Sequence, residues 1–419
     1  MFSDAYKRYV LGTLTLVYTL SYLDRGLILL LLQPIKEDLH LSDTQLGLLT
    51  GIAFGLFYAT LGLPIARWAD RGNRPLITVI AIGLWGGTLM LCLLVTNFIQ
   101  LVFARIAAAV GEAGCMPTTY SLLGDYFPDP AERTRAMATY WLASPLAALS
   151  SFILGGWLNQ HYGWRVAFFA MGLPALPVAA LVKLTVSEPR TRAQLPNRRL
   201  PRMMDVLNIL WRQPSSRHLS IVIVLVFTLW QGLGPWFAAF MIRSHGMGTT
   251  DLGVWLGLIF GIGGIAGTLL GGYVSARWFA GDERAQMRFS ATMIACLVPC
   301  LLVFLLVPGK REALIALVPL IVAGNVFLGP TFALLQRLVA DEMRATTLSV
   351  VMLLANLIGM GVGPQLVGIL SDSLRPLFGS DSLRYAMLTL SLVALWGAYQ
   401  FWRVGGTIKE DLRAVAARQ

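Results

Sequence analysis

Long apolar runs separated by short polar connections fill almost the whole chain. Most of these runs have about 20 residues or more, the length that a helix needs to cross the hydrocarbon core of a bilayer. The first run is too long for a cleavable signal and lacks a small-residue cleavage site, so we expect it to remain as the first helix. The pattern predicts twelve spanning helices, near 9–33, 44–68, 75–96, 98–124, 136–160, 165–186, 218–242, 252–278, 289–307, 313–338, 346–371 and 385–403.

Composition agrees with this pattern. Of the 419 residues 56% are hydrophobic and 13% are charged, and the mean hydropathy is +0.66. A soluble protein this apolar would expose large adhesive patches, so the composition favours an all-α membrane protein. Cys296 and Cys300 are four apart on a helix with no histidine or acidic partner nearby, and we expect all four cysteines to be buried packing residues rather than a metal site. They are Cys92, Cys115, Cys296 and Cys300.

The basic residues are distributed as a topology signal. The net charge is +11 and the pI is near 9.8, values that could suggest nucleic acid as a partner. If the N-terminus is cytoplasmic, however, 24 of the 33 lysines and arginines fall in cytoplasmic loops and tails and only 7 on the other side. This asymmetry follows the positive-inside rule, so we expect both termini in the cytoplasm, an inner-membrane location and no nucleic-acid partner.

The longest hydrophilic stretch, residues 187–217, divides six apolar runs from six. It contains seven arginines and no run long enough to span. We expect an N-terminal six-helix bundle over 1–186, a cytoplasmic linker over 187–217, and a C-terminal six-helix bundle with a cytoplasmic tail over 218–419.

The two halves share loop motifs at nearly one offset. Arg71 and Arg277 occupy similar positions 206 residues apart. Arg135 and Arg344 do so 209 residues apart. Such agreement indicates a duplication, and a six-plus-six repeat around a central cavity is a transporter architecture. The motifs are "ARWADRGNR" (66–74) with "GYVSARWFAGDER" (272–284), and "GDYFPDPAERTRAMAT" (124–139) with "QRLVADEMRATTLS" (336–349).

The first of these loops carries a family resemblance. "ARWADRGNR" resembles the major facilitator superfamily signature G-x-x-x-D-R-x-G-R-R, with Ala66 in place of the first glycine. "SYLDRG", "LPIARWADRGNR", "ARIAAAVGEAG" and "GWRVAFFAMGLPALPV…SEPR", in this order, look like the Spinster family within that superfamily. The anion:cation symporters also carry a "YLDR" pair, so that motif alone does not decide. The resemblance implies the major facilitator fold, with twelve helices in two pseudo-symmetric halves.

The resemblance also implies a cytoplasmic gate. Asp70 would latch the cytoplasmic side shut by accepting hydrogen bonds at a helix N-terminus. In the second loop Ala276 stands where Asp70 stands in the first, so the two halves should not gate symmetrically. A plain topology-setting basic loop would explain the arginines but not Asp70. We assign the gate to Asp70, Arg71, Arg74 and Arg135.

Four charged residues interrupt the apolar runs of the first half. Asp24 and Arg25 lie in the first run, and Arg105 and Glu112 lie in the fourth. Each costs at least about 2.5–3.5 kcal/mol inside a membrane, so they should pair with one another. Arg105 and Glu112 are two helical turns apart and face the same side, whereas Asp24 and Arg25 point about 100° apart. We expect Asp24 to pair with Arg105 or Arg25 with Glu112, and the sequence leaves both open.

A carboxylate in such a place is a candidate proton carrier. Burial favours its neutral form and a nearby guanidinium favours its charged form, so a small change of environment can load or release a proton. We assign proton coupling to Glu112, Asp24, Arg25 and Arg105, with Glu112 as the titrating group. The alternative is a static bracket that only holds the two helices together.

The remaining site residues are polar or aromatic groups in spanning segments. Gly232 and Pro235 could break the seventh segment beside Trp230. Helix packing is the alternative for each aromatic side chain. Our candidates for substrate binding are Arg25, Glu112, Tyr22, Tyr58, Trp230 and Asn356.

Together these features predict a proton-coupled secondary transporter that works by alternating access. The resemblance implies an amphiphilic lipid substrate such as a lysophospholipid or a sphingoid phosphate, and the alternative is a proton-coupled organic-anion or drug carrier. We find no Ser/His/Asp set for an enzyme and no phosphate-binding loop for direct ATP drive. A receptor or channel would not need the duplication. The expected partners are membrane lipids, protons and a small amphiphile, with no cofactor, no metal and a monomeric state.

Overall fold

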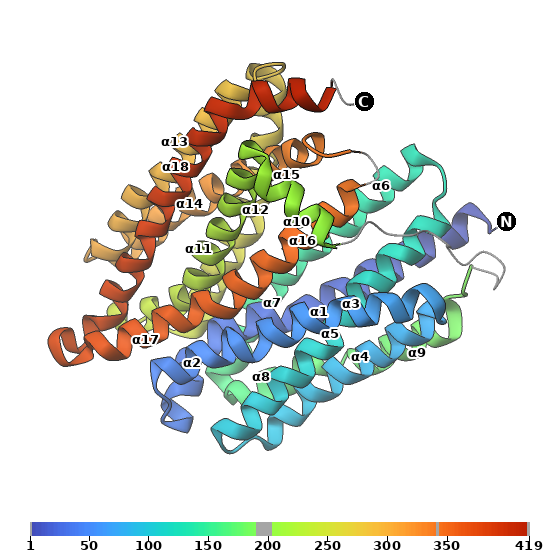
Figure 1. Cartoon of the computed structure of the whole chain (residues 1–419). Helices are drawn as coiled ribbons and strands as arrows, with labels where there is room; N and C mark the ends of the chain where they lie inside the picture. The colour runs from blue at the N-terminus through green and yellow to red at the C-terminus, as the bar shows by residue number, and fades with distance from the viewer. Residues whose placement is uncertain (1, 190–202, 341–342, 417–419) are drawn as a thin grey trace. The chain divides into compact units, whose positions relative to one another are not determined.

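The computed structural model describes residues 2–189, 203–340 and 343–416, and regular structure in these ranges is helical (Figure 1). Within these described ranges, eleven stretches are apolar and long enough to cross a membrane. The last, Thr346–Val415, is divided by the turn Gly379–Asp381 into two helical stretches, and so accounts for two of the twelve predicted spans. The predicted all-α, many-spanning fold is confirmed.

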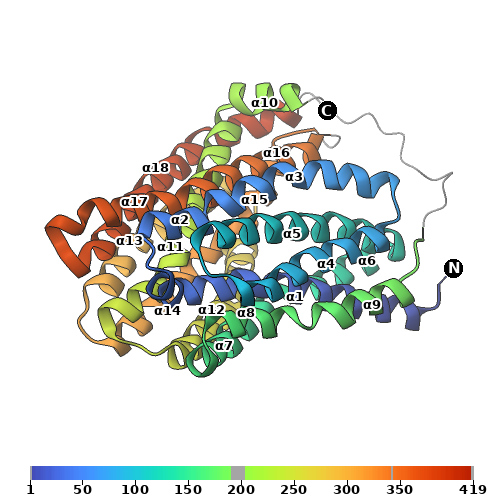
Figure 2. The same cartoon turned by 90° about the horizontal axis from the view of Figure 1, so that it is seen from below.

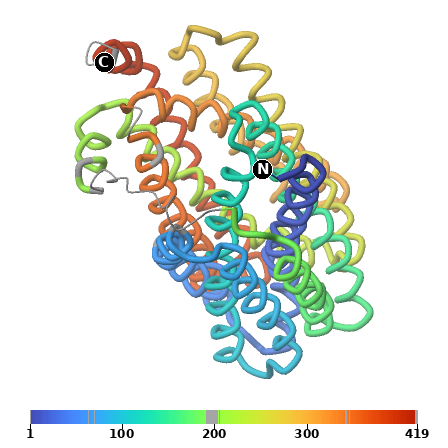
Figure 3. The backbone as a smooth tube through the Cα atoms, turned by 90° about the vertical axis from the view of Figure 1, so that its right-hand side faces the viewer, coloured from blue at the N-terminus to red at the C-terminus, as the bar shows by residue number. Residues whose placement is uncertain are grey.

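Contacts divide the chain into two compact units, Met1–Arg198 with Met247–Gly257, and Arg199–Gly246 with Leu258–Gln419. In the first unit α1 packs on α7, and α5 packs on both α3 and α4. Figures 1 and 2 show α3, α4 and α5 side by side, and Figure 3 shows the helices of this unit nearly end on. The helices of the first unit are α1 (Asp4–Leu39), α2 (Asp43–Thr50), α3 (Ile52–Arg71), α4 (Arg74–Leu91), α5 (Phe98–Tyr126), α6 (Pro130–Trp141), α7 (Ala143–Tyr162), α8 (Trp164–Gly172) and α9 (Ala175–Thr185).

The second unit is built around α18, which packs along α11 and α13. Figure 1 shows α13 and α18 side by side over most of their length. The chain of this unit begins with α10 (Met203–Arg212), α11 (Pro214–His245), the part of α12 (Thr249–Trp278) from Leu258 onward, α13 (Glu283–Leu306), α14 (Lys310–Val326) and α15 (Leu328–Arg337). It ends with α16 (Arg344–Leu354), a π-helical turn (Ala355–Met360), α17 (Gly361–Phe378) and α18 (Ser382–Ala416). The first part of α12, up to Gly257, belongs to the first unit.

The expected break in the seventh spanning segment is wrong. α11 is continuous from Pro214 to His245, with Pro235 buried inside it. Proline is tolerated in membrane helices because neighbouring helices and small local adjustments satisfy the freed backbone groups. The irregular turn lies instead at Ala355–Met360, where a Cβ on Gly359 would lie 2.8 Å from the carbonyl carbon of Phe227 in α11. Close helix packing therefore accompanies the π-helical turn.

In the second unit, several helix ends are tied together by polar contacts. Asp282 accepts a hydrogen bond from the Ala285 amide at the start of α13 and pairs with Lys409 of α18 at 3.2 Å. The hydrogen bond from Lys409 lowers the pKa of this exposed carboxyl. Asp411 accepts a hydrogen bond of 2.8 Å from the Ser215 amide in the first turn of α11. The end of α18 thus fastens the beginnings of α11 and α13.

Candidate functional site

The four intramembrane charges of the first unit form two ion pairs between α1 and α5. Arg25 Nε donates to Glu112 Oε2 at 2.7 Å. Arg105 Nη1 donates to Asp24 Oδ2. Asp24, Arg105 and Glu112 are buried, and 19% of the Arg25 side chain is exposed. Both of the pairings that the sequence left open are therefore present.

The sequence sets this arrangement through helix geometry. Asp24 and Arg25 are neighbours on α1, so their side chains leave the helix about 100° apart and reach different partners. Arg105 and Glu112 are seven residues apart on α5 and share a face. The close approach of α1 to α7 also helps to set this arrangement. A Cβ on Gly26 of α1 would lie 1.9 Å from the Ser151 hydroxyl of α7.

Gly111, immediately before Glu112, fixes the position of α5 against α4. A Cβ at this glycine would lie 2.7 Å from the Trp85 backbone nitrogen and 3.0 Å from the Ala81 carbonyl oxygen. A backbone neighbour cannot move aside as a flexible side chain can. The glycine of "GEAG" therefore lets α5 approach α4 at the level of Glu112.

We expect Gly111→Ala to lower the free energy of unfolding by about 1–3 kcal/mol, because the added methyl overpacks the contact with α4. Thermal denaturation of the purified protein in detergent measures this. Gly124→Ala is the matched control on the same helix, since a Cβ there has nothing within 4 Å. Equal melting temperatures for the two variants would contradict the packing role of Gly111.

Aromatic rings surround the Arg25 guanidinium. Its central carbon lies 4.4 Å from the ring centroid of Tyr22, 4.5 Å from that of Tyr58 and 5.2 Å from that of Phe54. The Arg105 guanidinium lies 4.7 Å from the Phe54 centroid. All four distances are within the range of favourable cation–π interaction. Ring faces therefore stabilise both cations in addition to their carboxylate partners.

Each member of the two ion pairs keeps one buried polar atom without a hydrogen-bond partner among the described residues. These atoms are Asp24 Oδ1, Arg25 Nη2, Arg105 Nε and Glu112 Oε1. Buried polar atoms are nearly always hydrogen-bonded, so four exceptions in one cluster call for an explanation. The cluster can therefore donate to an anionic group and accept from a cationic or protonated one.

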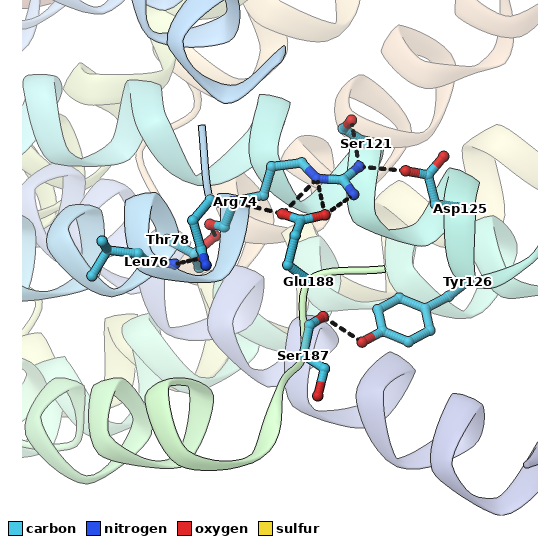
Figure 4. A network of polar contacts seen from close by, with 9 residues as sticks. Arg74, Leu76, Thr78, Ser121, Asp125, Tyr126, Ser187 and Glu188 are labelled. Atoms are coloured by element: carbon cyan, nitrogen blue, oxygen red, sulfur yellow. Dashed lines mark hydrogen bonds and ion pairs between the residues drawn. The ribbon is translucent and has the colours of Figure 1, made fainter. Parts of the chain in front are cut away.

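A second polar cluster lies at the predicted cytoplasmic end of the first unit (Figure 4). Arg74, in the first turn of α4, is fully buried. Its guanidinium donates to Asp125 Oδ2 at 2.7 Å and to Ser121 Oγ at 3.0 Å, both on α5. It also pairs with Glu188, which accepts from the Arg74 amide at 2.9 Å as well. Arg74 thus joins α4, α5 and the segment that follows α9.

Tyrosines hold the same segment in place beside Glu188. Tyr126 of α5 donates its hydroxyl hydrogen to the Ser187 carbonyl at 2.6 Å (Figure 4). Tyr6 of α1 donates to the Thr185 carbonyl at 2.7 Å. These hydrogen bonds and the Arg74 contacts therefore anchor the chain as far as Glu188. The residues that the structure does not describe, 190–202, begin shortly after it.

We expect Glu188→Gln to lower the free energy of unfolding by about 1.5–3 kcal/mol, the range for a hydrogen bond to a charged group, because it weakens a buried arginine's pairing. Melting temperatures of the purified variants measure the effect. Glu132→Gln is the control, since Glu132 is about half exposed and lies 3.7 Å from Lys7. Loss of stability no greater than in that control would contradict the anchoring role of Glu188.

Among the predicted gate residues whose side chains the structure describes, Arg71 and Arg135 take no part in this cluster. Arg71 and Arg135 are exposed, and neither side chain has a hydrogen bond or ion pair within the described ranges. Asp70 lies in the last turn of α3, but its side chain is outside the described residues. Residues 190–202 of the predicted linker are outside them too. Arg133 instead donates from Nε to the Phe127 carbonyl at 3.0 Å.

The predicted substrate-binding residues fall into two groups. Arg25, Glu112, Tyr22 and Tyr58 lie together in the first unit. Trp230 and Asn356 belong to the second unit. The Trp230 ring lies against Gly324 of α14, where a Cβ would come within 1.6 Å of it. Asn356 donates to the Met352 carbonyl at 2.9 Å within the π-helical region.

Sequence reasoning missed Asp125 and Glu188 as members of these clusters. A signal was present for Glu188, which belongs to "SEPR". Phe54, four residues before Tyr58, could be placed on the same helical face as Tyr58 from the sequence. The partners are 114 residues away for Glu188 and 51 for Asp125. Contacts this distant in sequence follow from tertiary packing. Among the described residues, no group of three or more metal-ligating side chains forms.

Comparisons with known proteins agree with the helical architecture. The family profile described as Major Facilitator Superfamily matches residues 14–364. The chain is 34% identical over 406 residues to an MFS-type efflux pump of Mycolicibacterium smegmatis, covering 96% of this chain and 93% of that one. It is 26% identical to protein spinster homolog 1 of Xenopus laevis, covering 97% and 82%. A bacterial homologue of the human lysosomal transporter Spinster, solved in an inward-facing and unoccupied conformation, matches with a TM-score of 0.86 at 28% identity, over 98% of this chain and 99% of that one.

Proposed function

The chain belongs to the major facilitator superfamily and is a multi-pass secondary transporter with Spinster homologues, and we propose that it couples substrate movement to protons through Glu112. The observation that carries this proposal is a buried carboxylate with one oxygen on Arg25 at 2.7 Å and the other without a partner. The family consists of transporters rather than enzymes.

Protonation of Glu112 would change what Arg25 can bind. With Glu112 charged, the two groups largely neutralise each other. With Glu112 protonated, the guanidinium keeps its aromatic contacts with Tyr22 and Tyr58 but loses its carboxylate partner. It then becomes a stronger site for an anionic group of the substrate. Substrate and proton thus alter each other's affinity, which is the thermodynamic requirement for coupling.

The proposed substrate is an amphiphilic lipid, such as a lysophospholipid or a sphingoid phosphate. The free donor on Arg25 suits the negative part of a head group. The apolar part would face the aromatic and aliphatic side chains of the spanning helices. The 24% identity over 437 residues to a sphingosine-1-phosphate transporter of Danio rerio supports this substrate class.

The second candidate is a proton-coupled organic-anion or drug carrier. The 34% identity to an efflux pump favours it. So do the rings around Arg25, because aromatic faces also bind planar aromatic compounds.

We further propose an inner-membrane location with both termini in the cytoplasm, and a cytoplasmic gate that includes Asp70, Arg71, Arg74 and Arg135. The basic surplus of the predicted cytoplasmic loops supports the orientation. The buried cluster around Arg74 supports a role for that residue in holding the helix ends of its unit.

Uptake into proteoliposomes tests the proposed function. Purified protein would be reconstituted, and uptake of a lysophosphatidylglycerol, of sphingosine phosphate and of ethidium would be followed with and without an imposed pH gradient. Saturable uptake of either lipid that is accelerated by the gradient supports the first candidate. Gradient-dependent movement of ethidium alone supports the second, and uptake indifferent to the gradient would contradict proton coupling for both.

A further inference from the structure

Phe54 of α3 lies against both intramembrane ion pairs. Its ring centroid is 5.2 Å from the guanidinium carbon of Arg25 and 4.7 Å from that of Arg105. The side chain is 2% exposed. Among the described rings, Phe54 is the one that contacts both cations. Tyr58, one turn further along α3, stacks on it at 5.7 Å and contacts Arg25.

This position has an electrostatic consequence. Two guanidinium groups in one buried site repel each other, and the negative face of an aromatic ring attracts each of them. Phe54 therefore stabilises an arrangement in which the two cations are close. A leucine of similar bulk would fill the space without this attraction.

The ring also links the responses of the two pairs. When Glu112 becomes neutral, Arg25 loses its charged partner, and Asp24 has an unpartnered Oδ1 on the neighbouring residue of α1. Any shift of Arg25 on the Phe54 ring alters the electrostatic field at Arg105, which contacts the same ring.

Several other ionisable or charged groups surround Glu112. They are Asp24, Arg25 and Tyr22 from α1, Tyr58 from α3, and Arg105 and Cys115 from α5 itself.

We propose that Phe54 is a positioning residue that makes the two ion pairs respond as one unit, so that neutralising Glu112 changes how Asp24 and Arg105 are held. This inference rests on the proposed role of Glu112 in proton coupling. It adds to that role the route by which the change at Glu112 reaches the second pair.

Phe54→Leu and Phe54→Tyr test the inference in the full-length protein in proteoliposomes. The first removes the ring face and the second keeps it. With the best-transported of the three probes above, we expect Phe54→Leu to reduce pH-gradient-driven uptake about tenfold while counterflow exchange stays within about threefold of wild type. We expect Phe54→Tyr to keep both rates within about threefold of wild type. Phe54→Met gives the same comparison if the leucine variant does not purify as folded protein.

A plain packing role would give a different result. Gradient-driven uptake and counterflow would then fall together, in proportion to the loss of folded protein seen by thermal denaturation. That outcome, or wild-type coupling in Phe54→Leu (in Phe54→Met where it replaces the leucine variant), would overturn the inference. Phe57→Leu is the matched control on α3, because the Phe57 ring has no cation–π contact with Arg25 or Arg105 among the described residues.

Glu112→Gln measured in the same assay separates this inference from the proposed function. Gradient-driven uptake that survives in Glu112→Gln overturns the proton-coupling role and, with it, the inference on Phe54. Uncoupling in Glu112→Gln together with normal coupling in Phe54→Leu overturns the inference alone.

Discussion

Glu112→Gln is expected to abolish transport driven by a pH gradient while leaving counterflow exchange measurable. Glutamine keeps the shape of the side chain and can still accept a hydrogen bond from Arg25, but it cannot bind and release a proton. Because the carboxylate is buried and paired with Arg25 at 2.7 Å, its protonation state decides the net charge of that pair. Uptake of the lipid probes into proteoliposomes, with and without the gradient, measures the effect.

The static-bracket alternative makes a different prediction for the same variant. If the Arg25–Glu112 pair only holds α1 against α5, Glu112→Gln should lower thermal stability, and transport should fall in proportion under every driving force. Near wild-type gradient-driven transport would contradict the assignment to Glu112 and transfer it to Asp24. Asp24→Asn in the same assay is therefore the matched control.

Arg105→Met is expected to destabilise the protein by about 3–5 kcal/mol, because it leaves the Asp24 carboxylate buried without its charged partner. Asp24 is 1% exposed, and its Oδ2 accepts from Arg105, so water cannot readily replace the lost contact. Methionine approximates the length of the arginine stem, which limits the part of the loss that comes from packing. Thermal and chemical denaturation in detergent measure the effect.

The double variant Asp24→Leu with Arg105→Met is the control for this prediction. Replacing both members of a buried ion pair by apolar residues is often neutral or stabilising, so most of the stability should return. We expect transport to remain impaired, because the second pair would no longer respond to Glu112. Wild-type stability in Arg105→Met alone would mean that Asp24 is hydrated or finds another partner.

The spans, the duplication and the identity of the four intramembrane charges could be predicted from the sequence. Spanning helices satisfy their own backbone hydrogen bonds, so apolar length alone reveals them. A charge in such a segment is costly enough to mark a site by its presence. The duplication can be inferred by comparing the loop motifs of the two halves, because they recur at offsets of 206 and 209 residues.

The partners of these residues depend on how helices rotate and pack, which hydropathy does not encode. Arg105 and Asp24 are 81 positions apart, and each could have met several opposite charges. Glu188 lies in the stretch predicted to be a cytoplasmic linker, yet it pairs with the fully buried Arg74. Pro235 suggested a break that neighbouring helices made unnecessary, and the π-helical turn at Ala355–Met360 contains no proline that would have revealed it.

The central claim, that substrate and protons move in coupled fashion through Glu112, is tested most directly by recording protons and substrate together. A pH-sensitive dye trapped in proteoliposomes would report proton movement as a lysophosphatidylglycerol or sphingosine phosphate gradient is imposed in the absence of a pH gradient. We expect proton movement that starts with the lipid, saturates with its concentration and is absent in Glu112→Gln. Saturable lipid transport by the wild-type protein without any proton movement would contradict the central claim.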